Sequence, residues 1–221
     1  MSESANPYEP VVITARESLA SQGNYEGLAG TATGLKTIYF GILLLLLCVI
    51  GMLVAAFTLP VAAIALGFLM LVGYLMLIIG PFFCLTAPEE TGAKGLIIGS
   101  IACQVVVLFL SVAPMLGIAI PEMISSVSGL VATIGSTLFV LFMMKIAGYI
   151  HRDDLRLQGR TILLGAVLLF VLMLASIAGV AVFGAIASGF TIGVAVGILV
   201  LFVMYANLVN ALYKAINSRQ R

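Results

Sequence analysis

Apolar residues fill most of the chain between Thr37 and Leu212, and short polar or proline-containing stretches divide them into long segments. A helix of about 20 apolar residues crosses the hydrocarbon core of a bilayer, because each residue adds about 1.5 Å to its length. We therefore expect an all-α fold, a polytopic transmembrane bundle of six helices arranged as three hairpins. The predicted helices are Thr37–Phe57, Ala62–Cys84, Gly95–Ile118, Val127–Tyr149, Thr161–Phe183 and Phe190–Leu212.

Prolines mark several of the predicted breaks. Pro60 places a tight turn at Thr58–Val61, because a proline interrupts a helix that would otherwise continue. Pro81 is expected to kink or loosen the end of the second helix, and Pro114 to kink the third. Between these two helices, Thr86 and Glu89 have the spacing of a capping box, in which each side chain bonds the backbone of the other residue.

The polar ends of the chain divide it into three parts. We expect residues 1–35 to form a mostly disordered cytoplasmic tail, 36–213 the six-helix transmembrane domain, and 214–221 a short basic cytoplasmic tail. The first tail contains Asn6-Pro7-Tyr8-Glu9-Pro10, in which two prolines oppose a helix. This motif is either a docking site for a protein partner or, more simply, part of a solvated tail.

The composition supports a membrane setting. Hydrophobic residues make up 62% of the chain and charged residues 9%, with a mean hydropathy of +1.25. Soluble domains carry about 25% charged residues, so the lipid bilayer is the first expected partner. The net charge of +1 leaves no basic surface for a run of phosphates, which argues against a nucleic-acid partner.

The distribution of cations predicts the orientation. Lysine and arginine near helix ends are retained on the cytoplasmic side of a membrane. With six helices, the side that holds both termini carries every lysine and arginine, and Glu122 is the only charge on the other side. Both termini are therefore expected in the cytoplasm. The cations are Arg16, Lys36, Lys94, Lys145, Arg152, Arg156, Arg160, Lys214, Arg219 and Arg221.

The first, third and fifth helices open alike, with a glycine, a cation and a second glycine. The three openings are Gly34-Leu35-Lys36 with Gly41, Gly92-Ala93-Lys94 with Gly99, and Gly159-Arg160 with Gly165. This likeness indicates either a repeated hairpin or only the shared need for a basic anchor at a helix entry.

Small residues are expected to set the helix packing, because lipid gives helices no hydrophobic reason to associate and close backbone approach must supply it. The candidate packing glycines are Gly95 and Gly99 in the third helix and Gly189, Gly193 and Gly197 in the sixth. Such a face packs within a hairpin or, in the alternative, joins two copies into a homo-oligomer. We favour packing within the hairpin.

Candidate polar residues inside the spans are few. Gln104, Asn207 and Asn210 carry amides that need partners in hydrocarbon. They either bond neighbouring helices or line a polar path, which would also need Ser111, Thr133, Ser136 and Thr137 to face a common cavity. No Asp or Glu lies mid-span, which argues against an ion-coupled transporter, and Lys145 is close enough to a helix end to reach the headgroups.

Motifs for catalysis and for cofactors are absent from the sequence, so we expect neither an enzyme nor a bound cofactor. A metal site is also not expected, because the one histidine, His151, has no second ligand at a typical spacing. The acids nearest to it in the loops are Asp153, Asp154, Glu89 and Glu90, and a solvated loop explains them better. Cys48, Cys84 and Cys103 fall within spans and are read as small buried residues.

Two inner segments, Cys84–Ile101 and Lys145–Gly159, together with the NPYEP motif, resemble uncharacterised bacterial multi-spanning membrane proteins. The resemblance implies a bacterial inner membrane and no particular activity. Three hairpins are also found in mitochondrial carriers, but their Pro-x-Asp-x-x-Lys signature is absent, so that likeness is rejected. We expect a structural or interaction membrane protein with cytoplasmic protein partners at its tail or inner loops. The alternative is a channel or facilitator for a small solute.

Overall fold

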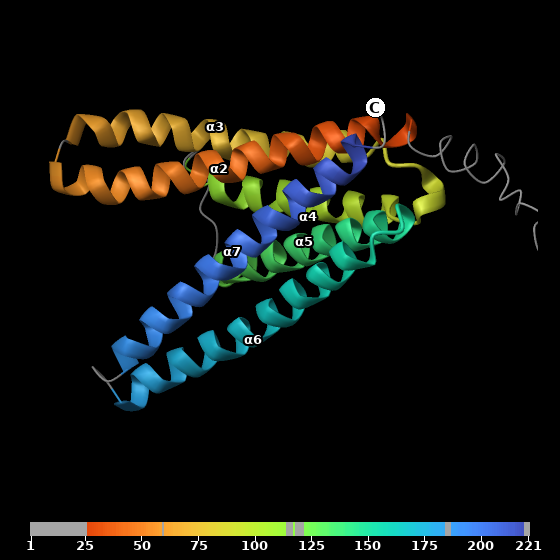
Figure 1. The fold of residues 1–221 in the computed structure, drawn as a ribbon. Helices are drawn as coiled ribbons and strands as arrows, with labels where there is room; N and C mark the ends of the chain where they lie inside the picture. Colours follow the sequence, from red (N-terminus) through yellow and green to blue (C-terminus); the bar gives the residue numbers. More distant parts are fainter. Residues whose placement is uncertain (1–25, 59, 114–116, 118–121, 184–186, 219–221) are drawn as a thin grey trace, which may run out of the picture.

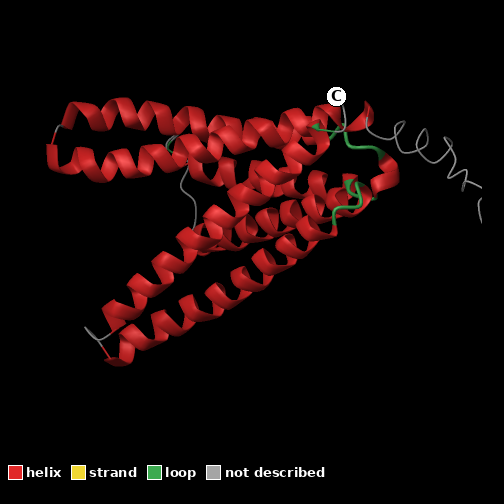
Figure 2. Cartoon of the chain, viewed as in Figure 1, coloured by secondary structure: helices red, strands yellow, loops and turns green. Residues whose placement is uncertain are grey.

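The computed structural model describes residues 26–58, 60–113, 117, 122–183 and 187–218, and within these residues it contains helices and no strands. Figure 2 shows the all-helical fold. The long helices are α2 (Ala29–Thr58), α3 (Pro60–Cys84), α4 (Lys94–Val112), α5 (Glu122–Tyr149), α6 (Asp153–Phe183) and α7 (Ala187–Asn217), with short 3-10 turns η1 (Glu26–Leu28) and η2 (Glu89–Thr91).

The six long helices are each long and apolar enough to cross a membrane. This confirms the predicted all-α transmembrane bundle and fits an integral membrane protein. Consecutive helices pack as three hairpins, α2 with α3, α4 with α5 and α6 with α7. Further contacts of α2 with α7 and of α5 with α6 join the hairpins into one bundle (Figure 1).

All six long helices begin earlier than predicted, and α2 and α6 do so by eight residues, because charged residues can occupy the exposed face of a helix whose other face is buried. α2 begins at Ala29, and buries Ala32 and Leu35 inside the stretch expected to be a disordered tail. α6 begins at Asp153, so the predicted start at Thr161 is wrong, and most of the charged stretch between Tyr149 and Thr161 is helical. Leu155, Gly159 and Ile162 recur at helical spacing and are buried, while the charged residues between them are exposed.

The other differences lie at the breaks. α4 ends at Val112, so its predicted continuation to Ile118 is wrong. Gly117 has a φ of +75°, and glycine adopts this left-handed conformation readily. The expected kink at Pro114 lies outside the described residues. α3 continues through Pro81 to Cys84, and it starts at Pro60, a first-turn position that suits proline because no amide donor is needed there.

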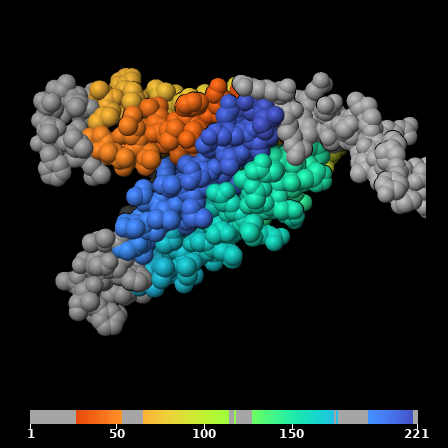
Figure 3. Space-filling model, in the orientation of Figure 1, coloured from red at the N-terminus to blue at the C-terminus, as the bar shows by residue number. Residues whose placement is uncertain are grey.

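The three hairpins converge at one end of the molecule and diverge at the other. Figure 1 shows the end of α7, the connection from α3 to α4 and the connection from α5 to α6 at the converging end, which we call the loop end. In Figure 3, an open notch separates the α2–α3 hairpin from α7 away from the loop end.

The buried core follows this shape. Large side chains that are fully buried come from α2, α4, α5 and α7 near the loop end, and include Ile38, Ile97, Phe142, Ile146 and Leu212. The parts of the helices farther from the loop end expose leucine, valine and phenylalanine. Because these exposed surfaces are apolar, they suit contact with lipid. Examples are Leu47, Leu71, Phe109, Leu164 and Leu199.

Candidate functional site

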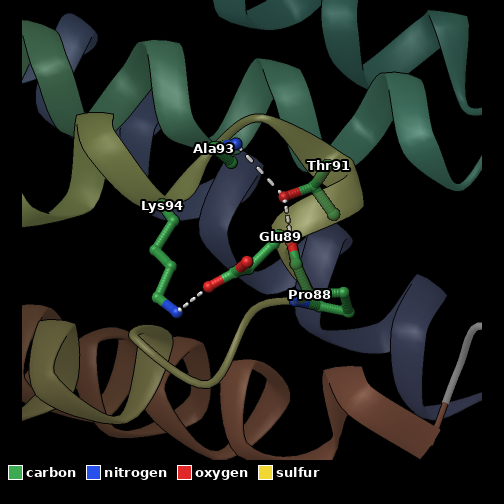
Figure 4. A network of polar contacts seen from close by, with 5 residues as sticks. All are labelled: Pro88, Glu89, Thr91, Ala93 and Lys94. Atoms are coloured by element: carbon green, nitrogen blue, oxygen red, sulfur yellow. Dashed lines mark hydrogen bonds and ion pairs between the residues drawn. The ribbon is translucent and has the colours of Figure 1, made fainter.

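The connection between α3 and α4 is held by a small polar network (Figure 4). The Thr91 hydroxyl donates to the Pro88 carbonyl at 2.7 Å and accepts from the Ala93 backbone N–H at 3.2 Å. Lys94 Nζ lies 2.7 Å from Glu89 Oε1. Thr91, and not Thr86, therefore satisfies a backbone donor at the start of α4.

The predicted capping box between Thr86 and Glu89 is wrong. The hydroxyl of Thr86 donates to the Phe83 carbonyl at 2.8 Å, because Thr86 lies in the turn that closes α3. Glu89 instead accepts from Lys94, and this hydrogen bond together with the charge of Lys94 lowers the pKa of Glu89. A lowered folded-state pKa favours the folded protein above the ordinary titration range of Glu, and this contribution is lost as the pH falls through the lowered pKa.

The connection between α5 and α6 is a short left-handed turn. His151 has a φ of +55°, its N–H donates to the Gly148 carbonyl at 3.1 Å, and the Arg152 N–H donates to the Ala147 carbonyl at 2.9 Å. These two bonds form a Schellman motif, in which glycine is the usual left-handed residue. The turn allows α6 to start immediately beside the end of α5.

Ion pairing neutralises only part of the charge at the loop end. Arg152 Nε and Nη2 donate to the two carboxylate oxygens of Asp154 at 2.9 and 2.8 Å, and this pairing raises the pKa of Arg152. Tyr149 Oη donates to Glu90 Oε2 at 3.5 Å and so connects the two loops. Within the described residues, Lys145, Arg156 and Arg160 have no ion pair.

Two surface grooves lie at the loop end. The larger, about 460 Å³, is lined by Leu96, Leu141, Met144, Lys145, Gly148 and Arg156. The smaller, about 300 Å³, is lined by Asp153, Arg156, Leu157 and Arg160. Arg156 belongs to both, so the grooves lie side by side.

The candidate polar residues of the spans line neither groove. Gln104 is half-buried, and its carbonyl oxygen is buried with no hydrogen-bond partner among the described residues. Asn207 is exposed and Asn210 half-buried. Hydroxyls of the proposed polar stripe bond carbonyls of their own helices: Ser111 with Val107, Thr133 with Gly129, and Ser136 with Thr133, at 2.8 to 2.9 Å.

A buried serine that the sequence analysis did not single out joins α4 to α5. Ser100 Oγ donates to the Gly135 carbonyl at 2.8 Å, and a Cβ on Gly135 would lie 2.8 Å from Cys103 Cβ. The missing side chain at position 135 lets the two backbones approach. The small residues Ser100 and Gly135 were the only sign of this contact in the sequence, which does not show that the two positions face each other.

The candidate packing glycines occupy different surroundings. A Cβ on Gly197 would lie 2.6 Å from Leu169 of α6, and one on Gly99 would lie 3.1 Å from Leu138 of α5. A Cβ on Gly95 or Gly193 would meet no atom within 4 Å. Gly95 and Gly193 therefore make no close helix contact among the described residues of this chain, and the surroundings of Gly189 lie outside what the structure describes.

The closest glycine packing is between α2 and α3. A Cβ on Gly34 would lie 2.5 Å from the Gly80 carbonyl oxygen, and one on Gly41 would lie 3.0 Å from that of Gly73. The two glycines are seven residues apart in each helix, so the antiparallel helices bring them face to face twice. The matched spacing of seven residues is present in the sequence, but it indicates helix packing only once α2 and α3 are known to pair.

The described residues include no group of three histidine, cysteine, aspartate or glutamate side chains arranged to hold a metal ion. The carboxylates of Glu89 and Asp154 are engaged with Lys94 and Arg152. Cys48 and Cys84 are buried, Cys103 is half-buried, and all three are free thiols. Comparison of the chain with protein-family models, curated proteins and solved structures finds no match.

Proposed function

We propose that this integral membrane protein has a structural or interaction role, in which the loop end of the bundle is presented to protein partners, and that it is not an enzyme. The observation that carries the proposal is the separation of polar and apolar surface. Polar side chains gather at the loop end, whereas the hydroxyls of Ser111, Thr133 and Ser136 within the spans bond carbonyls of their own helices and line neither groove.

The proposal includes a bacterial inner membrane with both termini in the cytoplasm. Its support is the position of the cations, since lysine and arginine near helix ends favour the cytoplasmic side. The described cations lie at or near helix ends that meet at the loop end, and α5 begins at the opposite end with Glu122. These cations are Lys36, Lys94, Lys145, Arg152, Arg156, Arg160 and Lys214.

The partners proposed are a cytoplasmic protein bound at the N-terminal tail or the inner loops, or a second copy of this chain. Glu90 is a suitable position to probe, because it is exposed on the loop between α3 and α4.

A channel or facilitator for a small solute is the second candidate, and one observation favours it. The carbonyl oxygen of Gln104 is buried inside a span without a partner, and a buried amide of this kind is costly unless water or a ligand satisfies it. A solute path would need further polar groups, yet the hydroxyl of Ser111, seven residues farther along α4, is bonded to the Val107 carbonyl of the same helix.

Two measurements separate these functions. A photo-crosslinking residue at Glu90 should give discrete protein adducts in native membranes, whereas the same residue at the lipid-facing positions Leu71 or Leu164 should not. Liposomes that contain the purified full chain should be no more permeable to glycerol or urea than empty liposomes. Solute flux that falls in Gln104→Leu, together with no adduct at Glu90, would overturn the interaction role in favour of the facilitator.

A further inference from the structure

The larger groove combines two unpaired cations with an apolar wall. It lies beside the connection between α5 and α6, at the level where these two helices would leave the membrane. Lys145 lies one turn before the end of α5, and Arg156 lies one turn after the start of α6. Because the two helices are antiparallel and joined by a short turn, both cations lie at one level beside the loop end. Both side chains are exposed and line the same groove.

These cations lack the partners that neutralise their neighbours. Lys94 is paired with Glu89 and Arg152 with Asp154, each within 2.8 Å. Across the described residues, no carboxylate lies within 4 Å of the charged nitrogens of Lys145 or Arg156. Among the described residues, no acidic side chain lines the larger groove, so its field is positive and suits an anion.

The rest of the groove is apolar. Leu96 of α4 and Leu141 and Met144 of α5 are half-buried and form its wall, and Gly148 leaves open space, since a Cβ there would meet no atom within 4 Å. Leu141 lies about 6 Å deeper along α5 than Lys145, at about 1.5 Å per residue. The groove therefore changes from cationic to apolar in the direction of the bilayer centre.

We propose that this groove binds an anionic phospholipid, with the headgroup phosphate between Lys145 and Arg156 and the start of an acyl chain against Leu96 and Leu141. Basic pockets between transmembrane helices are suited to anionic headgroups, and the cytoplasmic leaflet is the leaflet rich in them. The smaller groove extends the site, because Arg156 lines both grooves and Arg160 adds a third unpaired cation, so that the cations there outnumber the one acid, Asp153. The apolar wall distinguishes a lipid from a free anion, which would gain nothing from it.

The test is native mass spectrometry of the full chain in detergent, titrated with phosphatidylglycerol or phosphatidylcholine. The first phosphatidylglycerol adduct should form at lower lipid concentration than the phosphatidylcholine adduct. The variant Lys145→Gln/Arg156→Gln should weaken phosphatidylglycerol binding by about tenfold, since each cation near anionic lipid contributes on the order of a few-fold in affinity. The charge-preserving variant Lys145→Arg/Arg156→Lys should retain it.

Two further variants keep the test specific. Lys36→Gln/Lys214→Gln removes the same charge from exposed positions on α2 and α7 and should leave the first adduct unchanged. Gly148→Leu keeps both cations and fills the groove, so it should weaken binding. Circular dichroism establishes that each variant is folded. Equal binding of the two lipids, or an equal loss in the Lys36/Lys214 variant, would overturn the proposed site.

Discussion

The turn between α5 and α6 depends on one residue in an unusual conformation. His151 adopts a left-handed conformation. For a residue with a side chain, this conformation costs about 1–2 kcal/mol relative to the right-handed form. The two Schellman bonds from His151 and Arg152 offset that cost. Position 151 is not a glycine, so the usual sequence signal of a left-handed turn is absent. This is one reason why a longer loop was expected here.

Replacing His151 should therefore change stability according to backbone preference. His151→Gly should retain or raise the melting temperature, because glycine adopts the left-handed conformation without strain. His151→Val should lower the free energy of unfolding by about 1–3 kcal/mol, since a β-branched side chain is strained there. Thermal unfolding in detergent, followed by circular dichroism, compares the two variants. Identical melting temperatures would show that the turn does not constrain the protein.

At the scale of helices, the sequence predicted the number and order of the elements and missed several ends. A hydropathy profile averages the apolar character of a whole segment. The charged residues in the first two turns of α6 lower that average, so a loop was predicted there. In the structure only one face of α6 is buried there, as Leu155 and Ile162 show. Which face of a helix is buried depends on the helices that pack against it, and hydropathy along the chain does not identify them. The packing glycines were missed for the same reason, because Gly34 and Gly80 meet only once α2 and α3 fold together.

The α2–α3 hairpin should respond to one methyl group. Gly34→Ala would place its Cβ 2.5 Å from the Gly80 carbonyl oxygen, a backbone atom that moves only if the helices separate. Overpacking of this kind costs about 1–3 kcal/mol. Gly193→Ala is the matched control, because its Cβ would meet no atom within 4 Å and alanine favours a helix. Equal thermal stability of the two variants would contradict close packing between α2 and α3.

At the scale of the whole molecule, the sequence placed the described cations at one end of the bundle, where the structure has them. The groove between α4, α5 and α6 could not be predicted, because Leu96 is distant in sequence from Lys145 and Arg156. The sequence also could not show whether the polar stripe lines a channel. A serine or threonine that bonds its own helix, as Ser111 and Thr133 do, has the same sequence pattern as one that faces a channel. What charge did predict is the separation of cations such as Lys94 from Glu122, which lies at the opposite end.

The most direct test of the account is the sidedness of Asp153 and Glu122, which begin α6 and α5 at opposite ends of the bundle. Each is replaced by cysteine in a chain whose Cys48, Cys84 and Cys103 have been changed to alanine. A maleimide that does not cross membranes should label the Glu122→Cys variant in intact bacterial cells. It should label the Asp153→Cys variant, and cysteines added at either terminus, only after the membrane is opened. Labelling of positions 122 and 153 from the same side would contradict the six-span bundle.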